Sequence, residues 1–104
     1  MKKHIQPAKS LKSGVESLAT AINALKNAEQ IYAFLIDLCT PAELEAMADR
    51  WQVVEPLTKA VPYRQIHDET GVSVTTIGRV ARCLELGPGG YQLALKNAKK
   101  GGAA

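Results

Sequence analysis

The sequence of 104 residues lacks the features that mark membrane and secreted proteins. Its longest unbroken apolar run covers residues 31–36 and ends at Asp37, far short of the roughly 20 residues that a membrane-spanning helix needs. Met1-Lys2-Lys3-His4 leads into a polar stretch rather than into the apolar core of a signal peptide, which argues against secretion. We therefore expect a cytoplasmic protein.

Cysteine and histidine are scarce, with two residues of each. Cys39 and Cys83 could form one bridge at most, and because both lie in apolar helical surroundings we interpret them as buried, reduced thiols. His4 and His67 lie far apart without a CxxC or HxxxH pattern, so we predict no metal site. No Ser/His/Asp constellation or phosphate-binding glycine loop is visible either, and we do not expect an enzyme.

What the sequence does contain is enough apolar material for one small domain, together with segregated charge. Hydrophobic residues make up 46 % of the chain, and its length leaves no room for a second core. The net charge of +3 combines +4 over residues 1–26, −5 over residues 27–57 and +4 over residues 58–104. Basic ends around an acidic middle favour one face that binds a polyanion, although a mixed, solvated surface would give the same totals.

Helical periodicity begins after a polar N-terminal stretch. Residues 1–12 contain many lysines and predict a flexible basic arm. Ser13 and Glu16 have the spacing of a capping box, and apolar residues then recur at helical intervals as far as Leu25. These features predict the first helix.

A second helix is predicted over residues 28–38. It is apolar almost all round, because Tyr32 and Ile36 lie outside its main apolar stripe. A small monomer cannot easily bury such a helix, so a partner subunit is the natural cover.

The clearest helix start in the chain is Thr40-Pro41-Ala42-Glu43, which combines a capping hydroxyl, a proline in the first turn and a glutamate at the third position. The apolar stripe of this third helix is assigned to the core and consists of Leu44, Met47, Ala48, Trp51 and Val54. Pro56 predicts that the helix ends or kinks near Val54, with a connector over residues 56–62.

The last third of the sequence predicts a short helix over residues 63–70, a turn at Gly71 and a further helix capped by Ser73. The inward positions of this helix pair are apolar: Ile66, Ile77, Val80, Ala81 and Leu84. Residues 72–77 also alternate like a β-strand. Because the chain offers no partner strand to satisfy that backbone, we prefer the helix.

Glycine and proline in residues 87–90 interrupt the chain before a final basic helix over residues 91–100. The predicted organisation is therefore a flexible basic arm (1–12), one helical domain (13–100) and a frayed tail (101–104).

The helix-turn-helix pattern indicates a function. In this motif the first helix lies across the DNA backbone and the second enters the major groove, where small polar and basic side chains reach base edges and phosphates. We predict DNA contacts from Arg64, His67, Ser73, Thr75, Thr76, Gly78 and Arg82. Close approach to DNA or to a neighbouring helix would account for Gly78, and so would neutral drift. An ordinary antiparallel helix pair with exposed hydroxyls is the simpler alternative for the whole pattern.

The order and spacing of several segments resemble the Trp repressor family over about residues 30–95. The matching segments are LCTPAELEA (38–46), Arg50, VVE (53–55), YRQI (63–66), GVS (71–73), TTI (75–77), RV (79–80) and RCL (82–84). The element GGY (89–91) makes the chain most similar to the YerC/YecD-like branch of that family.

The resemblance implies an all-α, intertwined homodimer whose two helix-turn-helix units reach successive major grooves. It also implies an effector site, because tryptophan-sensing members hold the indole between two arginines that match Arg50 and Arg79, with a threonine that matches Thr40 near the ligand carboxylate. Cys83 stands where those members have a serine, so the effector could be L-tryptophan, another small molecule or none. A structural salt bridge at Arg50 and a phosphate contact at Arg79 are the simpler alternatives.

Two classes of function remain. The favoured class is a cytoplasmic transcriptional repressor that binds a double-stranded DNA operator as a homodimer through its helix-turn-helix. The alternative is a small helical module that binds another protein and does not bind DNA.

Overall fold

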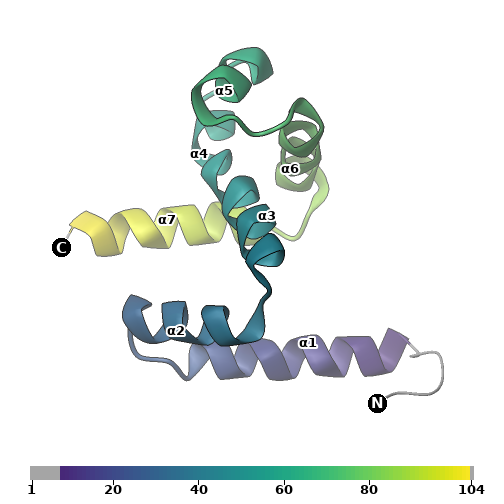
Figure 1. Ribbon diagram of the computed structural model, residues 1–104, viewed down its shortest axis with the longest axis vertical. Helices are drawn as coiled ribbons and strands as arrows, with labels where there is room; N and C mark the ends of the chain where they lie inside the picture. The colour runs from purple at the N-terminus through teal and green to yellow at the C-terminus, as the bar shows by residue number, and fades with distance from the viewer. Residues whose placement is uncertain (1–7, 104) are drawn as a thin grey trace. The chain divides into compact units, whose positions relative to one another are not determined.

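The computed structural model describes residues 8–103, which form seven helices and no strand (Figure 1). Two compact units follow one another along the chain, the first ending at Thr40 and the second beginning at Pro41. The helices are α1 (Ala8–Asn23), α2 (Ala28–Leu38), α3 (Pro41–Gln52), α4 (Val54–Thr58), α5 (Tyr63–Thr70), α6 (Val74–Leu86) and α7 (Gly90–Ala103). The all-α prediction is confirmed, and the strand alternative for residues 72–77 is excluded.

None of these helices has both the length and the apolar character that a membrane crossing requires.

The first unit consists of α1 and α2. Helix α1 begins at Ala8, so residues 8–12 of the predicted arm are helical, and Ser13 with Glu16 lies inside the helix instead of capping it. Alanine and lysine favour this extension because both are strong helix formers. Helix α2 has the predicted bounds, and the side chain of Asn27 caps it by accepting a hydrogen bond from the Gln30 N–H at 2.9 Å. Residues 1–7 of the predicted arm lie outside the described residues.

The prediction that residues 56–62 form a connector is wrong for residues 56–58, which are helical. Val54–Thr58 form the short helix α4, with Pro56 as its third residue. The first four N–H groups of a helix have no acceptor within the helix, so the missing donor of a proline costs nothing at this position. The break that the proline predicts lies at Val53, one residue before α4 begins.

The core of the second unit is small and entirely apolar. It contains six buried side chains: Val53, Val54, Ile66, Val72, Ile77 and Val80. Leu84 and Tyr91 are among the half-buried residues that pack around them. Each buried aliphatic side chain contributes about 1.5–3 kcal/mol relative to exposure, so this cluster holds α5 and α6 on α4. The predicted inward positions Ile66, Ile77 and Val80 are confirmed.

The assignment of the α3 stripe to the core is wrong for most of its members. Val54, which belongs to α4, is buried, whereas Leu44 is half-buried and Met47, Ala48 and Trp51 are exposed. Within the second unit α3 contacts α4 and α6, and these contacts cover only part of its apolar surface. Trp51 leaves 42 % of its surface open, which is unusual for an apolar side chain of this size.

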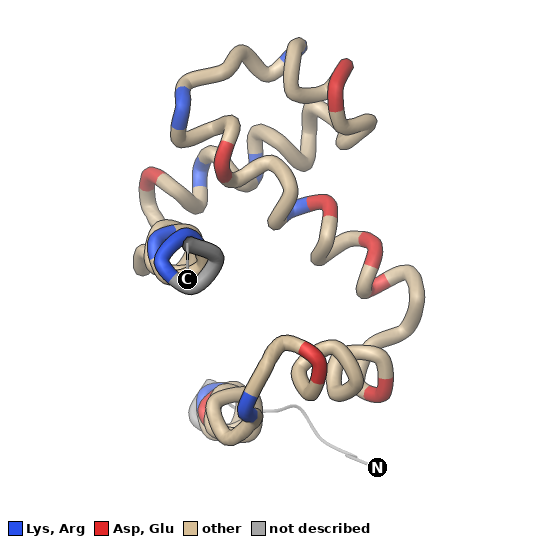
Figure 2. Tube along the Cα trace, turned by 90° about the vertical axis from the view of Figure 1, so that its left-hand side faces the viewer, with Lys and Arg blue, Asp and Glu red and all other residues tan. Residues whose placement is uncertain are grey.

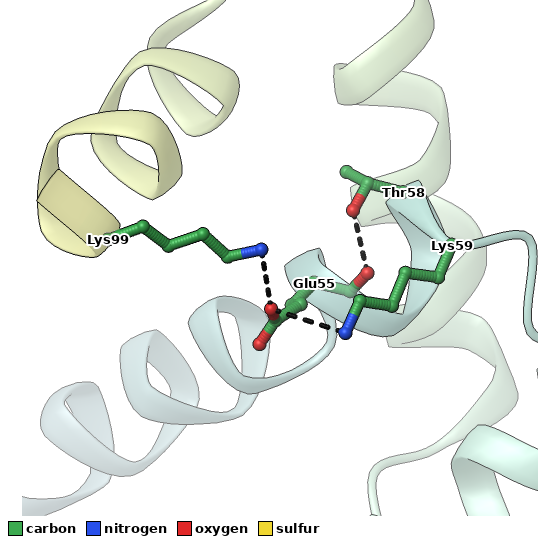
Figure 3. A network of polar contacts seen from close by, with 4 residues as sticks. All are labelled: Glu55, Thr58, Lys59 and Lys99. Atoms are coloured by element: carbon green, nitrogen blue, oxygen red, sulfur yellow. Dashed lines mark hydrogen bonds and ion pairs between the residues drawn. The ribbon is translucent and has the colours of Figure 1, made fainter. Parts of the chain in front are cut away.

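A charge cluster joins the C-terminal helix to the same unit (Figure 3). Glu55 on α4 places Oε2 2.9 Å from Nζ of Lys99 on α7 and 3.5 Å from Nζ of Lys59. The hydrogen bond from Lys99, followed by the positive charges of Lys59 and Lys99, lowers the pKa of Glu55 below its ordinary value of 4.5. Helix α7 extends to Ala103, three residues past the predicted end at Lys100.

Candidate nucleic-acid interface

The turn between α5 and α6 is held by hydrogen bonds at both ends. Gly71 ends α5 with a left-handed φ of 78°, and its N–H donates to the His67 carbonyl at 2.8 Å. Thr70 Oγ1 donates to the Ile66 carbonyl at 2.6 Å and accepts from the Val72 N–H at 3.1 Å. With Val72 buried between the two helices, these bonds fix the angle at which α6 leaves the turn.

Helix α6 begins with a pair of hydroxyls that bind each other. Ser73 Oγ accepts the Thr76 N–H at 3.1 Å, the capping bond that the sequence predicts, and donates to Thr76 Oγ1 at 3.0 Å. Thr76 is half-buried, whereas Thr75 between them is exposed. Neither threonine is enclosed in the core, so the start of α6 presents hydroxyl-bearing side chains at the surface.

The predicted cations lie on the surface of the same helix pair. Arg64 on α5 and Arg79 and Arg82 on α6 are exposed, while the opposite side of α6 is buried through Ile77 and Val80. Figure 2 shows that basic positions alone occupy α7, whereas acidic positions predominate on α2 and α3. The charge segregation in the sequence therefore corresponds to different helices.

His67 has a contact that sequence reasoning did not anticipate. Its Nδ1 lies 2.7 Å from the Val72 carbonyl. Because a carbonyl oxygen only accepts hydrogen bonds, Nδ1 is the donor in this contact, and Nε2 is the nitrogen left for other partners. The side chain is exposed, so it closes the turn and still reaches solvent.

Gly78 is not required by the packing of the helices in this chain. It is half-buried on α6, and a Cβ added there would lie 3.9 Å from Tyr63 Cε2, an ordinary van der Waals distance. Of the three interpretations offered for this glycine, close approach to a neighbouring helix of the same chain is therefore wrong. Close approach to DNA and neutral drift remain.

A pocket of about 450 Å³ brings together two of the four predicted effector residues, Arg50 of α3 and Arg79 of α6. Its complete lining is Ala46, Asp49, Arg50, Thr75, Thr76 and Arg79. Two predicted base-reading threonines therefore share a wall with the predicted effector site. Periodicity and spacing did not predict that Thr75 and Thr76 line this pocket, because α3 and α6 meet only through tertiary packing.

The lining of this pocket does not include the other two predicted effector residues. Cys83 is exposed, so the prediction of a buried thiol is wrong for this residue, and it lines a separate pocket of about 330 Å³ with residues 87–91. Thr40 is the last residue of the first unit, directly before α3. Cys39 is half-buried.

Two helices joined by a glycine turn, with the second capped by serine and exposing threonine and arginine, define a helix-turn-helix protein of the DNA-binding kind. Residues 13–99 match the family described as Trp repressor protein. The chain belongs to the Trp repressor family, a regulatory and non-enzymatic family of DNA-binding proteins.

Two relatives document the membership. The Bacillus subtilis (strain 168) protein YerC, whose function is uncharacterised, is 40 % identical over 86 residues, which is 83 % of each chain. A crystal structure of a candidate Trp repressor from Staphylococcus aureus is similar with a TM-score of 0.79 and 32 % identity, covering 91 % of this chain and 96 % of that one. The family resemblance seen in the sequence is confirmed.

Proposed function

We propose that this protein is a sequence-specific repressor that acts in the cytoplasm by binding a promoter operator as a homodimer. The observation that carries the proposal is the rigid turn, which directs α6 so that Thr75, Arg79 and Arg82 are exposed while Ile77 and Val80 anchor the helix. This is the arrangement by which a recognition helix presents one face to the major groove.

The proposed roles divide the predicted residues by their chemistry. Arg64, His67 and Arg82 contact phosphates, which sets affinity, and Ser73, Thr75 and Thr76 lie near base edges, which sets sequence preference. Gly78 allows close approach of the helix to the DNA. The arm and helix α7 add salt-dependent attraction through their lysines.

The homodimer is supported by the apolar surface that the single chain leaves open. Helix α2 contains no buried residue, and Tyr32 and Ile36 are exposed by 69 % and 50 %. Met47 and Trp51 add exposed apolar surface on α3. A second copy that covers these helices would place two recognition helices on one duplex, with half-sites about one helical turn apart.

A small effector is proposed for the pocket between Arg50 and Arg79. Guanidinium planes stack on aromatic rings and can also bind a carboxylate in a forked arrangement, so L-tryptophan or another small aromatic acid fits this pair. The family resemblance also assigned Thr40 and Cys83 to an effector, but Cys83 lines the separate pocket with residues 87–91, so the proposed site rests on the two arginines.

The decisive experiment is a selection of binding sites from random duplex DNA, with and without L-tryptophan, followed by affinity measurements at two salt concentrations. With three phosphate contacts per protomer, we expect affinity for the selected duplex to fall by about 10³-fold between about 50 and about 200 mM salt. A helical module that binds another protein would show no duplex affinity at either concentration, and that result would refute the repressor.

A further inference from the structure

An apolar side chain stands at the start of the recognition helix, where the sequence analysis considered only polar ones. Val74 is the first residue of α6 and leaves 51 % of its surface open. The core of this helix pair uses Val72 before it and Ile77 after it, so burial of the helix does not account for Val74. Its neighbours Ser73 and Thr75 are exposed as well.

The hydrogen bonds around Val74 reduce the number of polar groups that can read bases. Ser73 Oγ both accepts the Thr76 N–H and donates to Thr76 Oγ1, so its proton is already used inside the protein. Thr76 is half-buried and accepts that proton. Thr75 and Val74 are the exposed side chains of the first turn that take no part in this cap.

We propose that Val74 is a specificity-determining residue that contacts the 5-methyl group of a thymine in each half-site. The inference rests on the proposed function, because it assigns a base to the DNA-binding face. Thymine is the one base that presents a methyl group in the major groove, and an aliphatic side chain gains from covering that methyl. A second protein chain is a poorer occupant, because covering Val74 would also desolvate the hydroxyls of Ser73 and Thr75.

The test uses the selected duplex and replaces each half-site thymine in turn by deoxyuridine, which pairs identically but carries hydrogen in place of the methyl. At one thymine position we expect the wild-type affinity to fall by about fourfold for one half-site and about fifteenfold for both, as the loss of one buried methyl predicts. Fluorescence anisotropy on labelled duplexes measures both numbers.

Variants then assign the contact. Val74→Ala keeps a helix-forming residue at an exposed site and should bind the thymine and deoxyuridine duplexes equally, while Val74→Thr, which exchanges one methyl for a hydroxyl, should show intermediate discrimination. Thr75→Ser is the matched control, because it removes a methyl from the adjacent exposed residue and keeps the hydroxyl. It should retain the full discrimination.

Three results would overturn the inference. Wild-type protein could be indifferent to deoxyuridine at every position, Val74→Ala could retain the discrimination, or Thr75→Ser could abolish it. If the protein still selects a duplex and any of these outcomes is observed, the Val74 contact is overturned and the proposed repressor is not. A chain that selects no duplex at all overturns the proposed repressor, and the contact with it.

Discussion

At the residue scale, the hydrogen bonds of the helix-turn-helix separate side chains that look equivalent in the sequence. Ser73 and Thr75 both carry hydroxyls, yet Ser73 is bonded to the helix start while Thr75 is exposed. His67 is positioned by the Val72 carbonyl, so a residue proposed to contact phosphate also stabilises the turn. A mutation of His67 would therefore change the proposed phosphate contact and the stability of the turn together. Mutations at Thr75, Arg82 and Gly78 are more informative.

Substitutions of Arg82 and Thr75 should change DNA binding in different ways. We expect Arg82→Ala to weaken binding to all duplexes and to reduce the salt dependence by about one unit of slope per protomer, because it removes a phosphate contact. Thr75→Ala should change the preferred bases and leave nonspecific binding unaltered. Titrations against the selected duplex, a mutated duplex and an unrelated one distinguish the two, and equal losses across all three from both variants would contradict these roles.

Gly78 offers a substitution that should improve folding and impair function. Gly78→Ala places its methyl at an ordinary distance from Tyr63, so the gain in helix propensity, up to about 1 kcal/mol, should raise the free energy of unfolding. The same methyl should lower DNA affinity severalfold if the duplex comes close to α6. Thermal unfolding and anisotropy measure the two effects.

Gly14 provides the control, because it lies inside α1 with nothing within 4 Å of its added Cβ. Gly14→Ala should stabilise the protein and leave DNA affinity unchanged. If Gly78→Ala also left affinity unchanged, neutral drift would be the correct explanation of the glycine.

At the element scale, the helices whose ends are set by capping or turn residues nearby in the sequence have the bounds that the sequence predicts. Helix α2 runs over residues 28–38 and α5 over residues 63–70, as expected, and α6 follows the Ser73 cap. Two misplaced boundaries, at α1 and α4, are those where good helix formers or a tolerated proline extend a helix past a weaker signal, and α7 also runs past its predicted end to Ala103. Helix α7 is positioned in addition by the ion pairs at Glu55.

Glu55→Gln tests the attachment of α7 to α4. Because the folded-state pKa of Glu55 is lowered, its carboxylate stabilises the fold above the ordinary value of 4.5, and this contribution is lost as the pH falls through the lowered pKa. We expect a small decrease in stability at pH 7, since both lysines are exposed, and no difference from wild type in strong acid.

Chemical unfolding of both proteins between pH 7 and pH 3 measures the effect. Glu85→Gln is a suitable control, because it removes a carboxylate from α6 outside this cluster. A gap between wild type and Glu55→Gln that stays constant down to the lowest pH would mean that the carboxylate charge is not the cause.

At the scale of the whole molecule, the described part of the chain leaves large apolar side chains at its surface. Only six apolar side chains in the described part of the chain are buried, while large ones such as Tyr32, Ile36 and Trp51 are exposed. A free monomer would carry this surface in water at considerable cost. The proposed homodimer removes that cost and sets the spacing of the two recognition helices at the same time.

Ile36→Glu should therefore shift the protein from dimer to monomer. A charge introduced at a buried subunit contact lacks a partner and costs several kcal/mol, so stability and operator affinity should fall together. Sedimentation equilibrium gives the mass of the particle. Ser17→Glu, which adds the same charge on the polar side of α1, should remain dimeric, and a wild-type protein that is monomeric at micromolar concentration would contradict the proposal.

The sequence by itself determined the helical class, the glycine turn, the serine cap and the family, because each depends on groups within a few residues of one another or on their order along the chain. Only the tertiary structure decided that Arg50 and Arg79 share a pocket with Thr75 and Thr76, and that most of the α3 stripe lies at the surface. Those outcomes depend on which faces of separate helices meet, and helical periodicity identifies an apolar face without identifying what covers it.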